Sequence, residues 1–177
     1  MFALIRLLFV ALLQLCVVAA GGFGYVKTTG LKAQPDPGVL ETRVARAVRA
    51  WAVPRDIRTM AGPVAASTEA VAAGMRHFAR YCVLCHGNDG GGKGTAYSRG
   101  FFPKVPDMRL ADTQNLTDGE LFYIIENGVR FTGMPAFGTG HADPAGETLA
   151  WQLVQFIRHL PTITLDEIGE MESLNPL

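Results

Sequence analysis

The sequence contains few cysteines, no excess of charge and no strand-like alternation of polar and apolar residues. Three cysteines among 177 residues are too few for the two Cys-x-x-Cys pairs that a structural zinc site usually has. The 16 basic and 16 acidic side chains cancel. This balance argues against a nucleic-acid-binding protein, because phosphates require a concentrated basic surface. The lack of alternation and of internal repeats predicts an all-α fold.

Charge is unevenly distributed along the chain. Residues 27–64 carry seven basic and three acidic side chains, a balance of +4. Residues 65–177 carry eight basic and thirteen acidic side chains, a balance of −5. A chain of this length is expected to form one domain with appendages, and the charge contrast separates a basic N-terminal part from an acidic domain.

An apolar run of twenty residues, 7–26, lies close to the N-terminus. Twenty helical residues reach about 30 Å, the thickness of the hydrocarbon layer of a bilayer. We therefore predict that residues 1–26 form a signal-anchor or transmembrane segment, with Phe23 and Tyr25 at the membrane interface. A signal peptide that is cleaved after residues 18–20 (Val-Ala-Ala) is the alternative.

Residues 27–64 are predicted to be a linker that contains one basic amphipathic helix. Prolines and glycine at positions 35–38 break regular structure, and residues 39–53 then show helical periodicity that ends at Pro54. The apolar positions that share one face are Leu40, Val44, Ala47, Val48 and Trp51. A basic amphipathic helix beside an anchor lies on anionic lipid, docks on a partner or packs on its own domain, and the sequence leaves these alternatives open.

The stretch Cys82-Val83-Leu84-Cys85-His86 predicts the covalent attachment of one c-type haem. Cys82 and Cys85 would each add to one vinyl group, and the adjacent His86 would become the proximal ligand of the iron. Zinc sites and thioredoxin-like redox centres also use Cys-x-x-Cys. Haem attachment is favoured, because the remaining cysteine, Cys16, lies in the apolar run and no βαβ pattern surrounds the motif.

Helical signals surround the haem motif. Ser67 is the expected N-cap of a helix that ends near Cys82. Capping boxes at residues 117–120 and 164–167 predict two further helix starts. The apolar periodicity of residues 145–160 predicts a long helix between them.

The segment after His86 is rich in glycine. Residues 87–95 nearly match a phosphate-binding P-loop, since Gly87, Gly92 and Lys93 have the required spacing. Gly94 stands where that motif needs a hydroxyl residue, and a predicted helix rather than a strand precedes the loop. We expect the glycines to let the backbone turn tightly beside the haem.

Met134 is the predicted second axial ligand of the haem iron. A thioether is a soft ligand, and Pro135 would brace the loop that presents it between two predicted helices. Met108 and His141 are the alternatives. Methionine more often fills a hydrophobic core than binds a metal, so the prediction depends on the Gly133-Met134-Pro135 context.

Three motifs resemble those of a class I c-type cytochrome, in particular of membrane-anchored bacterial monohaem cytochromes. They lie at residues 82–87, 133–137 and 153–160, and the resemblance covers about residues 66–162. It implies a cytochrome c fold, with three to five helices around one covalently bound haem c. The domain would span residues 65–177 and end in a short helix.

The resemblance also implies features of packing and ligation. The helix before Cys82 is expected to cross the 145–160 helix through Gly74, Phe78, Leu153 and Phe156. A proline carbonyl is expected to accept the Nδ1 proton of His86, which fixes the imidazole tautomer. Pro106 is assigned this role, with Pro103 as the alternative. Met108 departs from the family pattern, which has a leucine-like residue at that place.

The expected function is the transfer of single electrons between redox protein partners. Ligation by His86 and Met134 leaves no iron site for a small-molecule substrate, so an electron carrier is expected rather than an enzyme. The lysine and arginine count would place the domain in the cytoplasm. The resemblance instead implies haem attachment outside the bacterial inner membrane, and hence a periplasmic domain.

Other functions are compatible with the same haem site. One alternative is a haem subunit of a larger dehydrogenase or oxidase complex, which changes the partners but not the chemistry. A haem-based sensor or a peroxidase is a further alternative, and either would need an open or displaceable sixth position on the iron. The sequence does not define the electron donor or acceptor.

Overall fold

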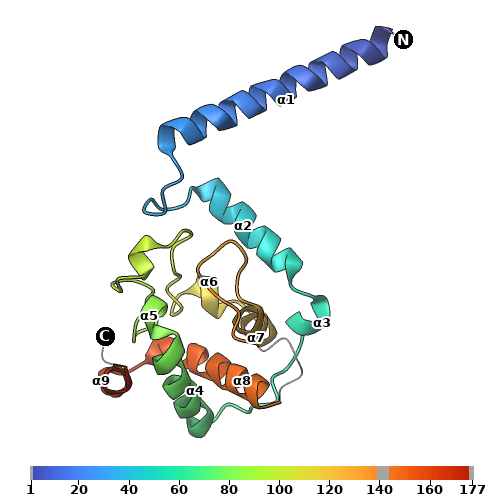
Figure 1. Cartoon of the computed structure of the whole chain (residues 1–177). Coiled ribbons are helices and arrows are strands. Elements are labelled where there is room, and N and C mark those ends of the chain that lie inside the picture. Colours follow the sequence, from blue (N-terminus) through green and yellow to red (C-terminus); the bar gives the residue numbers. More distant parts are fainter. Residues whose placement is uncertain (1, 139–143, 176–177) are drawn as a thin grey trace. The chain divides into compact units, whose positions relative to one another are not determined.

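The computed structural model describes residues 2–138 and 144–175, and its regular structure is helical, with no strand in those ranges (Figure 1). Backbone contacts divide the chain into two compact units, residues 1–33 and residues 34–177. Residues 27–33 of the predicted linker fall in the first unit and residues 34–64 in the second, and the predicted domain bounds stay a prediction. The two units are described separately.

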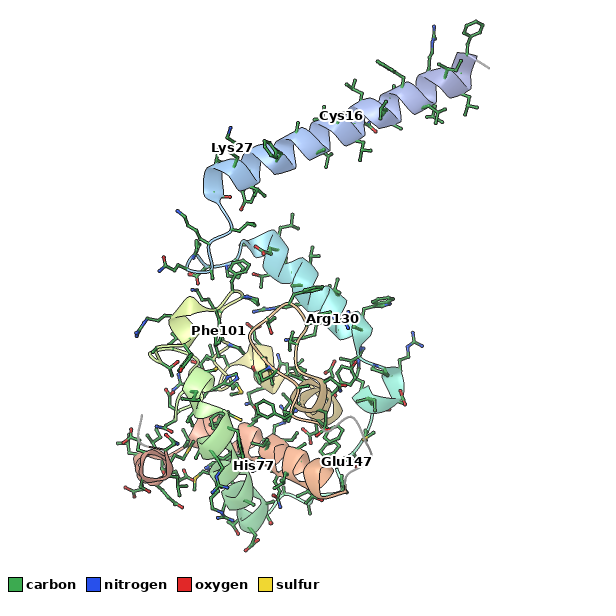
Figure 2. All side chains as sticks on the ribbon, viewed as in Figure 1. Cys16, Lys27, His77, Phe101, Arg130 and Glu147 are labelled. Atoms are coloured by element: carbon green, nitrogen blue, oxygen red, sulfur yellow. The ribbon has the colours of Figure 1, made fainter. Side chains whose placement is uncertain are left out.

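The first unit is one long helix, α1 (Phe2–Thr29), which contains the predicted apolar run. None of its residues is buried, and its apolar side chains project on all sides (Figure 2). Its 28 residues reach about 42 Å at 1.5 Å per residue. By length and composition α1 could cross a membrane, a property that signal sequences share.

The second unit contains the remaining helices. The longer ones are α2 (Val39–Ala52), α4 (Thr68–Tyr81), α7 (Asp118–Asn127), α8 (Pro144–His159) and α9 (Leu165–Leu174). The single-turn helices are α3 (Arg55–Arg58), α5 (Val83–His86) and α6 (Ala111–Gln114), and short 3-10 turns lie at Ser98–Gly100 and Leu160–Thr162. The all-α prediction is confirmed. The pattern of the sequence did not predict α3 or α6, because one turn of helix has no measurable periodicity.

Side-chain caps set three of the helix starts, as predicted. The Ser67 hydroxyl accepts a hydrogen bond of 3.1 Å from the Ala70 backbone N–H at the start of α4. Thr117 and Thr164 form reciprocal capping boxes with the glutamates three residues later, at the starts of α7 and α9. Each cap satisfies backbone N–H groups that have no partner within the helix.

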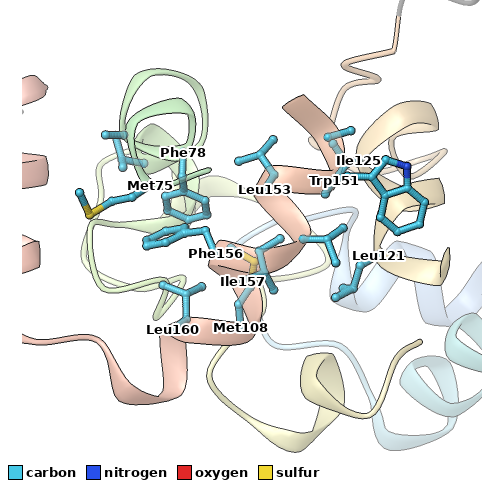
Figure 3. Packing of buried hydrophobic residues seen from close by; sticks show 14 of the residues in the cluster. Met75, Phe78, Met108, Leu121, Ile125, Trp151, Leu153, Phe156, Ile157 and Leu160 are labelled. Carbon is cyan, nitrogen blue, oxygen red and sulfur yellow. The ribbon is translucent and has the colours of Figure 1, made fainter. Parts of the chain in front are cut away.

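The crossing of α4 and α8 forms the centre of the core. A Cβ atom at Gly74 would clash with the Gln152 carbonyl and lie 2.9 Å from the Phe156 Cβ atom. The ring centroids of Phe78 and Phe156 lie 5.2 Å apart at the same crossing, within the buried cluster of Figure 3. The expected crossing is confirmed, with the Gln152 backbone rather than Leu153 against the glycine.

Gly74 and Gly169 provide a matched test of this packing. Gly74→Ala places a methyl group against the α8 backbone and should lower the free energy of unfolding by about 1–3 kcal/mol. Gly169 lies in α9 with nothing within 4 Å of a Cβ atom, so Gly169→Ala should raise it by up to about 1 kcal/mol. Guanidinium unfolding of both variants measures the difference. Equal effects of the two substitutions would show that the close crossing is not needed.

Candidate haem-binding site

The Cys-x-x-Cys-His segment follows the C-terminal end of α4 and forms the single turn α5. The Cys82 N–H donates to the Phe78 carbonyl (2.8 Å), and the His86 N–H donates to the Cys82 carbonyl (2.9 Å). Gly87 ends the turn with φ 73°, a left-handed conformation that favours glycine. The backbone thus continues from α4 into α5 with the two cysteines and the histidine on one short, hydrogen-bonded segment.

His86 is positioned as a neutral imidazole. Its ring centroid lies 6.2 Å from that of Phe78, the aromatic residue at the α4–α8 crossing. Burial lowers the pKa of His86 to about 4, so the ring is uncharged at neutral pH, the form that binds a metal. Its Nδ1 atom is buried and has no hydrogen-bond partner among the described residues, although part of the residue's surface is accessible.

The two thiols lack the features of a zinc site or of a dithiol redox centre. Both cysteines are free. Burial and the neighbouring Cys85 raise the pKa of the Cys82 thiol to about 12, and burial raises the pKa of the Cys85 thiol. Redox-active and metal-binding cysteines are favoured by a lowered pKa instead. Within the described part of the chain, no three His, Cys, Asp or Glu side chains gather as a metal site.

The glycine-rich loop brings Pro106 close to the His86 backbone. The Gly92 N–H donates to the His86 carbonyl at 2.9 Å, and Gly92 has φ 67°. A Cβ atom at Gly92 would lie 2.5 Å from the Pro106 carbonyl oxygen, so only glycine permits this approach. The predicted hydrogen bond from His86 Nδ1 to Pro106 is not formed in the structure, and the role of Pro106 stays a prediction.

An arginine fork that the sequence did not reveal fastens this loop. Arg109 Nη1 donates to Asp89 (2.7 Å), while its Nε and Nη2 donate to the two carboxylate oxygens of Asp107 (2.8 and 2.7 Å). Asp89 also accepts from the Gly91 N–H at 2.9 Å. The fork links the loop after His86 to the segment that carries Pro106, although Asp89 and Arg109 are twenty residues apart.

The loop that carries Met134 folds back on the C-terminal end of α7. Gly128, with φ 65°, ends the helix, and a Cβ atom there would lie 2.7 Å from the Met134 carbonyl oxygen. The Val129 N–H donates to that oxygen (3.2 Å). The Thr132 hydroxyl donates to the Val129 carbonyl (2.7 Å) and accepts from the Met134 N–H (3.1 Å). Hydrogen bonds therefore hold both the N–H and the carbonyl group of the Met134 backbone.

The Met134 loop also meets the segment that follows the haem motif. A Cβ atom at Gly133 would lie 2.5 Å from the Phe101 ring. Phe101 and Arg130 are labelled in Figure 2 on the two segments that make this contact. The segment that follows His86 thus touches the Met134 loop at Phe101, five residues before Pro106.

The rival ligands have different surroundings. Met108 is 6% exposed and belongs to the buried hydrophobic cluster, where Figure 3 shows it beside Ile157. Met134 is partly exposed on its loop. His141 lies outside the described residues. A buried methionine that packs on apolar side chains is core filling, and Met134 as the iron ligand stays a prediction.

A partly buried neutral imidazole, two free thiols and a braced methionine loop in an all-α fold fit a haem c, as in a class I c-type cytochrome. A family model described as "Cytochrome C oxidase, cbb3-type, subunit III" matches residues 69–157, about half of the chain. The chain belongs to this family, whose cytochrome c domain indicates haem binding and electron transfer rather than catalysis. A search of curated proteins finds no match.

The Arg109 fork should be visible in the pH dependence of stability. Hydrogen bonds from Arg109 lower the pKa of Asp107 in the folded protein below its unfolded value of 3.8. The ionised Asp107 carboxylate therefore stabilises the fold fully above pH 3.8, and this stabilisation is lost as the pH falls through the lower pKa of the folded state. Arg109→Gln should reduce stability at pH 7 by about 1 kcal/mol, since the pairs are partly exposed.

Denaturant unfolding of the haem-loaded protein at several pH values checks this prediction. The difference between Arg109→Gln and the wild type should stay constant from neutral pH down to about pH 5 and shrink below the unfolded pKa of Asp107. A difference that does not change with pH would show that the fork contributes packing rather than ion pairing.

Proposed function

We propose that this protein is a membrane-anchored monohaem cytochrome that carries single electrons. Cys82 and Cys85 would hold one haem c, His86 would be its proximal ligand and Met134 its distal ligand. The observation that carries the proposal is the partly buried His86 imidazole, whose Nδ1 atom is buried without a hydrogen-bond partner, on the same short segment as two free thiols. α1 would anchor the chain in the membrane, since it is long and apolar enough to cross it.

The protein's own groups would keep the iron environment constant. The haem supplies a one-electron couple, which a thioether ligand shifts to higher potential. α5 fixes the His86 backbone through the Cys82 carbonyl, and Thr132 holds the Met134 backbone. Ligands that stay in place in both oxidation states need little rearrangement during electron transfer. The same two ligands would exclude a small-molecule substrate from the iron.

The partners would be redox proteins in or near a bacterial inner membrane, with the haem domain in the periplasm. The balance of −5 over residues 65–177 favours basic partners, and this attraction weakens with salt. An anchor would confine the domain to the membrane surface and raise its effective concentration for membrane partners. The description of the matching family names an oxidase subunit, which supports a second candidate function, that of a haem subunit within an oxidase complex.

The ligand assignment is tested by two methionine variants. Met134→Ala should abolish the weak near-infrared sulfur-to-iron band of the oxidised protein and allow the reduced protein to bind carbon monoxide. Met108→Leu conserves volume and should cost less than about 1.5 kcal/mol, with the band intact. A band that survives Met134→Ala, or that disappears only in Met108→Leu, would move the ligand away from Met134.

A further inference from the structure

Helix α2 presents an apolar face that the structure leaves uncovered. Leu40, Val44, Val48 and Trp51 recur at intervals of four, four and three residues, so they share one side of the helix. Their exposed fractions are 75%, 53%, 56% and 85%. We call these four residues the apolar face of α2. Trp51 is the most exposed of them, and no residue of α2 is buried.

The opposite side of α2 is the one that contacts the haem domain, and its contacts are polar. Arg46 donates to both carboxylate oxygens of Asp112, at the start of α6, over 2.9 and 2.6 Å. Burial and the neighbouring Arg46 lower the pKa of Arg49, against the opposing effect of Glu120 and Asp112. Thr42, Arg46 and Arg49 are spaced four and three residues apart, roughly opposite the apolar face.

Arg58 completes this attachment from α3. Its Nη2 donates to the Ala50 carbonyl near the end of α2, and its Nε lies 3.4 Å from the buried Glu120. The second contact is an ion pair without a hydrogen bond, since Arg58 Nε has no hydrogen-bond partner in the described structure. Arg46, Arg49 and Arg58 are thus directed toward the acidic domain, and the apolar side chains away from it.

An amphipathic helix in a soluble domain normally does the reverse, with its apolar side inward. A contiguous set of exposed apolar side chains that includes a tryptophan marks a surface that contacts a membrane or another protein. We infer that the apolar face of α2 lies in the lipid interface of the membrane that α1 would cross, so that α2 holds the haem domain on the membrane surface. This inference rests on the proposed role of α1 as an anchor.

Two observations favour lipid over a protein partner, and a third indicates which contacts would hold α2 there. Residues 30–38 separate α2 from α1, and nine residues span at most about 32 Å, so an anchored α1 keeps α2 close to the bilayer. Tryptophan and leucine on one face of a helix suit the boundary between headgroups and acyl chains. Arg46 pairs with Asp112 and Arg49 is half-buried, which leaves the exposed Arg43 as the third arginine of α2, so apolar contact more than attraction to anionic lipid would drive the association.

Nitroxide labels on the full-length, haem-loaded protein in phosphatidylcholine nanodiscs test the inference. Cys16→Ser removes the thiol in α1, the haem occupies Cys82 and Cys85, and a single cysteine is then placed by Val48→Cys or Ala45→Cys. Ala45 is also exposed but lies off the apolar face, so it is the matched control. The ratio of collision rates with oxygen and with a water-soluble nickel complex should be several-fold higher at position 48.

The same spectra distinguish the other occupants. Equal access of the nickel complex to positions 48 and 45 would place the apolar face in water and overturn the inference. Low access of both reagents at position 48 would show a covering protein, and mutual broadening of two labels would identify a second copy; either result overturns it. A high oxygen-to-nickel ratio at position 48 that appears only in nanodiscs with phosphatidylglycerol, and that falls with added salt, would show that arginines rather than the apolar face contact the membrane.

A further variant tests the role of α2 independently of the anchoring role of α1. Val44 is exposed, so Val44→Asp should leave folding and the haem spectrum unchanged while the oxygen-to-nickel ratio at position 48 falls to that at position 45. The protein should still float with vesicles through α1. Failure to float would contradict the anchor, whereas floating with an unchanged ratio in Val44→Asp would contradict the role of α2 alone.

Discussion

The crossing of α4 and α8 at Gly74 is the constraint on which the rest of the haem domain depends. The absent side chain lets the α8 backbone approach at Gln152, and Phe78 and Phe156 pack beside it. Because Phe78 also lies next to the His86 ring and its carbonyl accepts from Cys82, the same crossing sets the position of the haem motif. The packing of the core therefore also determines the position of His86.

Loops held by glycine and by polar clamps complete the site. Gly92 admits the Pro106 carbonyl beside the His86 backbone, and Gly128 admits the Met134 loop against the end of α7. The Arg109 fork and the Thr132 hydroxyl then hold these loops by hydrogen bonds. Rigid ligand loops suit electron transfer, because an iron whose ligands do not move needs little reorganisation when its charge changes.

Short local patterns in the sequence predicted the parts of the structure that local chemistry determines. Ser67, Thr117 and Thr164 cap their helices as expected, because a cap depends on residues three positions apart. The Arg109 fork and the contact of Gly133 with Phe101 join distant segments, and no local pattern reports such pairs. The periodicity of α2 predicted an amphipathic helix, but it could not show that the arginine side faces the domain.

Potentiometric titration of the full-length protein in detergent, followed in the visible spectrum, tests the central claim that this chain carries one electron on one haem c. The single Cys-x-x-Cys-His motif predicts one fully reversible step that fits a one-electron Nernst curve. His86 and Met134 ligation further predicts that carbon monoxide leaves this step unchanged. Two separate steps, or a step that carbon monoxide displaces, would contradict the account.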